Sequence, residues 1–245
     1  MSDDYGIRSA DYRLPDALRL GRVRLQVSDL NRSLAFYEGL LGMRVIDGDR
    51  DGVRLGTIDG GEPLLELRPG AKRQSSRRGH LGLYHFAVLL PDRAALGRLL
   101  AHLMESGVHP GAADHLVSEA LYLQDPDDLG IELYRDRPRT EWTARDRQLA
   151  MSTDPLDARA VVAAADGAAW AGMPGGTVIG HLHLHVGDIA HARAFYHEAL
   201  GFDVIVWSYP GALFMSAGGY HHHLGVNTWA GAHARPPAPD EPQLL

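Results

Sequence analysis

The sequence predicts an α+β fold built from repeated βαβββ units. Residues 21–46, "GRVRLQVSDLNRSLAFYEGLLGMRVI", align without gaps with residues 180–205, "GHLHLHVGDIAHARAFYHEALGFDVI", at a constant offset of 159 positions. Each copy has the pattern of a strand with alternating apolar residues, then a helix, then a second strand. Two more short strands follow each copy. A self-alignment of this kind indicates that a structural unit has been duplicated.

The first unit is expected at residues 21–69. Its opening strand ends at Asp29, whose side chain is suited to cap the helix that follows. Apolar residues recur at helical spacing as far as Leu41, and Gly42 is placed to end the helix. The strands "MRVID", "GVRLGTI" and "PLLELRPG" complete the unit, with a turn at residues 60–61.

A divergent second unit is expected at residues 81–135 and a third at residues 179–230. In the second, "LGLYHFAVLL" is the first strand, an amphipathic helix follows, and "EALYLQDPDDLGIELYRD" supplies the closing strands. In the third, "ALFMSA" and "HHHLGVNTW" are the closing strands, with glycines at 218 and 219 between them. Residues 136–178 join the second unit to the third, and "DPLDARAVVAAADGAAW" within them predicts a helix.

Composition limits the kind of protein this can be and the residues that could bind a metal. With 245 residues and 45% hydrophobic content, the chain is typical of soluble globular proteins, and its net charge of -7 argues against nucleic acid as a partner. No apolar run is long enough to span a membrane and no secretory signal is seen, so we expect a cytoplasmic protein without a membrane partner. Cysteine is absent, so a metal would have to be held by histidine and carboxylate.

Three histidines alternate with leucines in the first strand of the third unit. Because side chains two positions apart share one face of a strand, His181, His183 and His185 should stand in a row. The equivalent positions of the first unit also carry polar residues, so a wet concave face without metal would explain the row equally well. We expect His181 to be a ligand candidate and the other two to be polar neighbours in the cavity.

Several segments carry a family resemblance: "VSDLNRSLAFYEGLLG", "YHFAVLLPD", "ALYLQDPDDLGIELYRDRPRTEW" and "SAGGYHHHLGVNTWAG". They resemble the vicinal oxygen chelate superfamily of glyoxalases, bleomycin resistance proteins and extradiol dioxygenases. Within it, the chain is most similar to bacterial two-domain proteins of the catechol 2,3-dioxygenase kind. The resemblance implies four units, paired into two cupped half-barrels, whereas this sequence shows three. We therefore expect a complete N-terminal domain at residues 1–140, a helical connector at 141–178 and an incomplete C-terminal domain at 179–245.

The resemblance also implies a divalent metal held by His and Glu side chains. Two histidines and one carboxylate with open positions suit Fe(II); Mn(II), Zn(II) or no metal are the alternatives. The resemblance makes His181 a ligand whose two partners belong to the missing fourth unit, so this site should be incomplete and its activity weak. His85 and Glu132 occupy matching positions in the second unit and offer a separate N-terminal site, with Glu66 as a further candidate. The first unit has Arg22 at the ligand position, and arginine cannot bind a metal.

The segment "HHLGV" resembles the extradiol motif whose second histidine is an acid or base beside the metal. That role carries over to His223, and histidine suits it because its ordinary pKa lies near neutrality. A polar strand end with solvated imidazoles is the alternative interpretation of His221, His222 and His223.

The function implied by the resemblance is extradiol ring cleavage of a catechol-type substrate by Fe(II) and dioxygen, as part of aromatic compound catabolism. Two alternatives stay open: a metal-free or degenerate protein that binds a small aromatic ligand, and a glyoxalase-type isomerase or lyase. Units one and two should pair around a cavity. The concave face of unit three should be covered by another chain or by the connector, and we expect a homo-oligomer.

Overall fold

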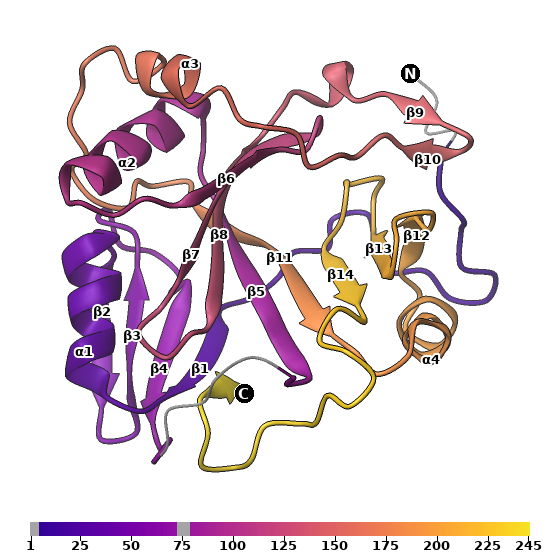
Figure 1. Ribbon diagram of the computed structural model, residues 1–245, viewed down its shortest axis with the longest axis horizontal. Helices are drawn as coiled ribbons and strands as arrows, with labels where there is room; N and C mark the ends of the chain where they lie inside the picture. Colours follow the sequence, from indigo (N-terminus) through magenta and orange to yellow (C-terminus); the bar gives the residue numbers. More distant parts are fainter. Residues whose placement is uncertain (1–4, 73–78) are drawn as a thin grey trace.

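The strands of the protein form two main sheets and a short two-stranded ribbon (Figure 1). The structure is a computed structural model that describes residues 5–72 and 79–245. Its strand-rich α+β architecture confirms the predicted fold class. Within the described ranges, no helix has the length and apolarity needed to cross a membrane.

Unit one builds most of a five-stranded sheet with the order β15-β1-β4-β3-β2. Asp29 accepts a hydrogen bond from the backbone of Arg32 and so caps the helix, as the sequence predicts. Gly42 follows the helix with a φ of 71°, a conformation that glycine adopts without strain. The elements are β1 (Val23–Val27), α1 (Leu30–Leu34), the π-helical η1 (Ala35–Leu40), β2 (Arg44–Asp49), β3 (Gly52–Gly56), β4 (Leu65–Pro69) and, from far along the chain, β15 (Gln243–Leu244).

Units two and three together build an eight-stranded sheet with the order β12-β13-β14-β11-β5-β8-β7-β6. Unit two supplies β5 (Gly82–Leu89), α2 (Arg93–Glu105), β6 (Gly111–Asp114), β7 (Ser118–Gln124) and β8 (Gly130–Asp136). Unit three supplies β11 (Val178–His185), α4 (Ile189–Arg193), the π-helical η3 (Ala194–Ala199), β12 (Asp203–Val206), β13 (Ala212–Ser216) and β14 (Leu224–Asn227).

The expected pairing of unit one with unit two is wrong. In every unit the last strand lies parallel to the first, which leaves one edge of the first strand open. The open edges of β5 and β11 pair with each other in antiparallel register, with Phe86 opposite Leu182. The open edge of β1 is taken by β15. Unit two is therefore joined to unit three, while the domain boundaries near residues 140 and 178 stay a prediction.

The connector covers part of unit three, as expected. Leu149 and Met151 pack against Ile205, Val206 and Phe214 of β12 and β13. The helix predicted in this segment is shorter than its apolar pattern suggested. The elements here are η2 (Arg139–Glu141), β9 (Ala144–Arg145), β10 (Gln148–Leu149) and α3 (Ala158–Ala163).

One large hydrophobic core lies between the two sheets and the helices that cover them. It joins Leu25 and Leu67 of the five-stranded sheet to Phe86 and Leu99 of unit two. Tyr37 is fully buried there. In unit three, the counterpart of Tyr37, Tyr196, packs against the smaller second core cluster, whereas Phe195 is 56% exposed.

Candidate metal centre

The centre of the eight-stranded sheet brings three neighbouring strands together. β11 pairs with β5, and β5 pairs with β8. Ala87 of β5 is the register partner of both His181 on one side and Glu132 on the other. Because alanine is small, the long side chains of its two partners can meet above it. His85 lies two positions before Ala87 and so faces the same way.

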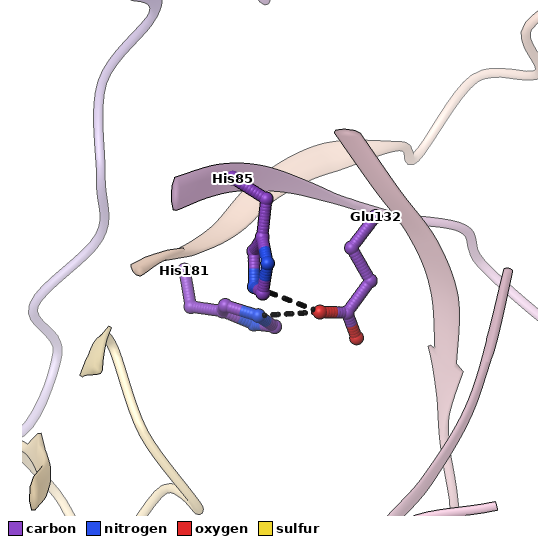
Figure 2. Close-up of side chains that lie close together, drawn as sticks. All are labelled: His85, Glu132 and His181. Carbon is purple, nitrogen blue, oxygen red and sulfur yellow. Dashed lines mark hydrogen bonds and ion pairs between the residues drawn. The ribbon is translucent and has the colours of Figure 1, made fainter. Parts of the chain in front are cut away.

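His85 and His181 converge on Glu132 (Figure 2). The Nε2 atom of each ring lies 3.0 Å from the same carboxylate oxygen, Oε2 of Glu132. The potential ligand atoms of the three residues all lie within 4.8 Å of one another. All three side chains are buried, so water does not screen the group.

The protonation states of the group suit metal binding. Burial lowers the pKa of His181 despite the attraction of Glu132, which keeps this imidazole neutral near pH 7. Burial alone would raise the pKa of Glu132. The hydrogen bonds and charges of His181 and His85 outweigh burial and hold that pKa well below its usual range. A neutral imidazole beside an ionised carboxylate is the state in which both bind a cation.

The expectation of two separate, incomplete sites is therefore wrong. His181 was assigned to a C-terminal site, and His85 with Glu132 to an N-terminal one. The pairing of β5 with β11 places all three in one cluster. Unit two thus supplies two side chains that could share a metal with His181, so the reason given for weak activity no longer holds.

Glu66 lies outside this cluster, on the five-stranded sheet. Its carboxylate accepts hydrogen bonds from Arg22, Arg24 and Arg68. Burial would raise its pKa, but the three guanidinium groups lower it to about 2. In unit one, arginines thus surround the carboxylate at the position that corresponds to Glu132.

The other two histidines in the row on β11, His183 and His185, are both hydrogen-bonded to one asparagine. Asn227 donates from Nδ2 to Nε2 of His183 at 3.0 Å, and its Oδ1 lies 2.6 Å from Nδ1 of His185. Burial lowers the pKa of His183 well below its ordinary value. Both residues are polar neighbours of the cluster, and His183 lines the cavity beside it.

The three consecutive histidines precede strand β14 instead of lying in it. The ring of His222 packs against that of His181, with centroids 4.0 Å apart and the ring planes tilted by 45°, and His222 lines the same cavity as His85 and Glu132. His223 lines a different cavity, together with Tyr220. Burial lowers the pKa of His222 well below its ordinary value and that of His223 to about 4. The acid–base role of His223 stays a prediction. The position of His222 in the cavity beside the cluster favours His222 for that role.

Sequence reasoning missed Tyr122, which lies next to the cluster. It is the register partner of Glu132 across β7 and β8. Its hydroxyl lies 2.6 Å from Nε2 of His115, whose Nδ1 lies 2.6 Å from the carbonyl oxygen of Ser152. Because a carbonyl only accepts, Nδ1 carries the proton and Nε2 accepts from the tyrosine. The available signal was the register of the last two strands of unit two, which puts position 122 on the face of Glu132.

A cavity of about 280 Å³ opens beside the cluster. Besides His85 and Glu132, its walls include Tyr84, Phe214 and Trp229. Its size and its mixture of aromatic walls with a few polar groups fit a single small organic ring.

Comparisons with known proteins identify the family to which the chain is related. The model of the Glyoxalase/Bleomycin resistance protein/Dioxygenase superfamily matches residues 19–133 and 178–239. A catechol-2,3-dioxygenase of Bacillus subtilis (strain 168) is 48% identical over 225 residues, which cover 90% of this chain and 78% of that relative.

A solved structure shares the fold of this chain. A putative dioxygenase from Bacillus subtilis subsp. subtilis str. 168 superposes with a TM-score of 0.58 at 16% identity, over 88% of this chain and 65% of that one. A variant of homoprotocatechuate 2,3-dioxygenase from B. fuscum gives a TM-score of 0.41 at 19% identity, over 91% of this chain and 56% of that one. The chain thus spans less than two thirds of the length of either structure.

Proposed function

The chain belongs to the glyoxalase/bleomycin resistance protein/dioxygenase superfamily, and on this basis we propose that it is a metal-dependent extradiol dioxygenase. Its substrate would be a catechol, and its metal Fe(II). The observation that carries the proposal is the convergence of His85 and His181 on one oxygen of Glu132.

The donor set fits Fe(II). Two imidazoles and one carboxylate on one side of an ion leave other coordination positions open, which is the arrangement of non-haem Fe(II) oxygenases. Neighbouring strands fix the backbones of the three residues, so the ligands are presented in a set geometry without a large loss of entropy. Bound Fe(II) would supply a site where catechol oxygens and dioxygen meet.

The residues around the ligands then have distinct tasks. The hydroxyl of Tyr122 is hydrogen-bonded to His115, and His115 is hydrogen-bonded to the main chain of the connector. These two bonds hold Tyr122 in place next to Glu132. His222 faces the cavity, so it is placed to exchange a proton with a substrate hydroxyl. Phe214 and Tyr84 exclude water and provide surfaces against which an aromatic ring can pack.

The test combines metal analysis with oxygen uptake. The protein should be loaded anaerobically with Fe(II), desalted, analysed for iron and then given catechol in aerated buffer. We expect one iron per chain and ring opening with consumption of oxygen. His85→Ala, Glu132→Ala and His181→Ala should each lose both, whereas His191→Ala, on the exposed face of α4, should keep both.

Two results would contradict the proposal. One is full iron content in all three ligand variants. The other is iron-loaded protein that consumes neither catechol nor oxygen. A cytoplasmic location, a homo-oligomeric state and a role in aromatic compound catabolism remain part of the proposal and need separate tests.

A further inference from the structure

A chain of hydrogen bonds leads from His222 to a second cavity. His222 lines the cavity beside the metal centre, and its Nδ1 lies 2.7 Å from Nδ1 of His221. The other ring nitrogen of His221, Nε2, lies 2.9 Å from Oδ1 of Asp136. Asp136 lines a separate cavity of about 320 Å³, whose described walls also include Asp16 and Arg139. Two consecutive histidines and one carboxylate therefore connect cavities that have no described lining residue in common.

This chain of hydrogen bonds is closed to water in its middle and open at its far end. The side chain of His221 is fully buried, whereas that of Asp136 is 25% exposed. The ring of His221 packs against the rings of Tyr220 and His222, with centroids 4.1 and 4.6 Å away. The hydroxyl of Tyr220 also donates to Oδ1 of Asp136, at 3.2 Å. Packing and hydrogen bonds together fix the orientation of the ring and of the carboxylate.

The direction of each hydrogen bond follows from the chemistry of the carboxylate. An ionised carboxylate only accepts, so Nε2 of His221 carries the proton of that neutral ring. Nδ1 of His221 then has a lone pair and accepts the proton on Nδ1 of His222. Nε2 of His222 is left without a proton, and among the described residues no group is hydrogen-bonded to it. Its lone pair is available to a molecule in the cavity beside the metal centre.

We propose that Asp136 and His221 are positioning residues that fix the tautomer of His222 and carry a proton between substrate and the second cavity. This inference rests on the proposed function, because it takes a catechol hydroxyl to lie beside His222. The hydroxyl proton moves to Nε2 of His222. The proton on Nδ1 of His222 moves to Nδ1 of His221, and the proton on Nε2 of His221 moves to Oδ1 of Asp136. Three bonds to hydrogen break and three form, and both rings are neutral before and after.

Such a relay avoids a charged ring beside the metal ligands. The ring of His222 packs against that of His181, and no carboxylate among the described residues is hydrogen-bonded to it. A proton that stayed on His222 would place a positive charge next to a bound divalent cation, at a cost in free energy. In the relay the proton ends on Asp136, which is partly exposed and can release it to water.

The tautomers can be measured without turnover. The chain, labelled with ¹⁵N-histidine, should be loaded with Zn(II), a diamagnetic ion that also binds histidine and carboxylate, and studied by long-range ¹⁵N–¹H correlation. We expect His221 to carry its proton on Nε2 and His222 on Nδ1. Asp136→Asn keeps an acceptor oxygen and should retain this pattern, whereas Asp136→Ala should lose it. A proton on Nε2 of His222 in the wild type would overturn the inference.

Chemical rescue tests the transfer of the proton. Asp136→Ala should lower kcat for catechol by at least about tenfold with iron content unchanged. Asp136→Asn should be as slow, because an amide oxygen does not take up the proton. Formate, a small carboxylate that fits the second cavity, should restore part of the kcat of Asp136→Ala. His221→Phe should also be slow, but formate should not restore it, because the link to His222 is missing.

Asp16→Asn is the matched control, because Asp16 lines the same second cavity without a hydrogen bond to either histidine. It should keep the kcat of the wild type and show no response to formate. Thermal unfolding shows whether each variant is folded. Wild-type kcat in Asp136→Asn, or formate rescue of both Asp136→Ala and His221→Phe or of neither, would overturn the inference.

The two proposals fail in distinguishable ways. If the tautomers are as expected but the Fe(II)-loaded protein does not open catechol, the proposed function fails and the positioning of His222 stands. If catechol is opened while His222 carries its proton on Nε2, the proposed function stands and this inference fails.

Discussion

A β-carbon on Gly180 would lie 1.8 Å from the hydroxyl oxygen of Tyr134, so a side chain larger than hydrogen does not fit directly before His181. The tyrosine is fully buried, and its hydroxyl is hydrogen-bonded to Tyr220 at 2.7 Å. It therefore has little room to move away. The spacing between β11 and β8 at the metal centre depends on this glycine.

Gly180→Ala should accordingly displace His181. We expect a loss of Fe(II) affinity of at least about tenfold and a lower melting temperature, both measured on purified protein. The matched control is Gly21→Ala, the equivalent position in unit one, where an added β-carbon would have no neighbour within 4 Å. Adding Tyr134→Phe to Gly180→Ala should restore part of the affinity. Equal behaviour of the two alanine variants would contradict the argument.

Glu66→Gln should show that Glu66 and Glu132, which occupy matching positions in units one and two, have different roles. Because three arginines converge on Glu66, its loss should lower the free energy of unfolding by about 1–3 kcal/mol. Iron content should stay at the wild-type level. In Glu132→Gln the main effect should instead be the loss of iron. The measurements are urea unfolding without metal and iron analysis after desalting; iron loss in Glu66→Gln would return this residue to the list of ligands.

The histidine that exchanges a proton with substrate can be identified by kinetics. His222 faces the cavity of the metal centre and His223 faces another one. His222→Ala should therefore lower kcat by about 100-fold or more with iron content unchanged, and His223→Ala should stay closer to wild type. The reverse order would favour the motif resemblance over the cavity geometry.

Asp125 should make stability depend on pH. Burial raises its pKa from 3.8 to about 6, although hydrogen bonds from Tyr37 and two backbone amides oppose this. Because the folded protein binds this proton more tightly than the unfolded chain, the contribution to stability is complete below pH about 4 and is lost as pH rises through about 6.

Asp125→Asn should remove this dependence. The stability difference between wild type and variant should change by up to about 3 kcal/mol between pH 4 and pH 7, with wild type gaining relative stability at the acid end. Urea unfolding of metal-free protein at several pH values gives the measurement. Asp51→Asn, on an exposed turn, serves as the control and should show no such trend. If the free energies of unfolding of wild type and Asp125→Asn vary with pH in parallel, the raised pKa of Asp125 is refuted.

The units could be predicted from sequence because their signals are local. Alternation, the caps at Asp29 and Asp188 and the glycines after each helix depend on neighbouring residues only. The pairing of units could not be predicted this way, because every unit offers the same open edge on its first strand. Local patterns do not say which two edges meet.

The candidate site shows the same division. His85, Glu132 and His181 could each be selected by residue type and strand position. Their meeting depends on the pairing of β5 with β11, so they were assigned to two sites. His222 was passed over because the motif resemblance assigned the acid or base role to His223, whereas it is His222 that lines the cavity of the cluster.

The three candidate ligands straddle the contact between β5 and β11, two strands that lie far apart along the chain. An ion bound there would be a reversible cross-link between units two and three. Because an ion that binds only the folded state adds stability in proportion to the logarithm of its free concentration, the strength of this cross-link would follow the metal supply around the protein. At low metal concentration the pairing of β5 with β11 would then be weakened before the fold of unit two or of unit three by itself was affected.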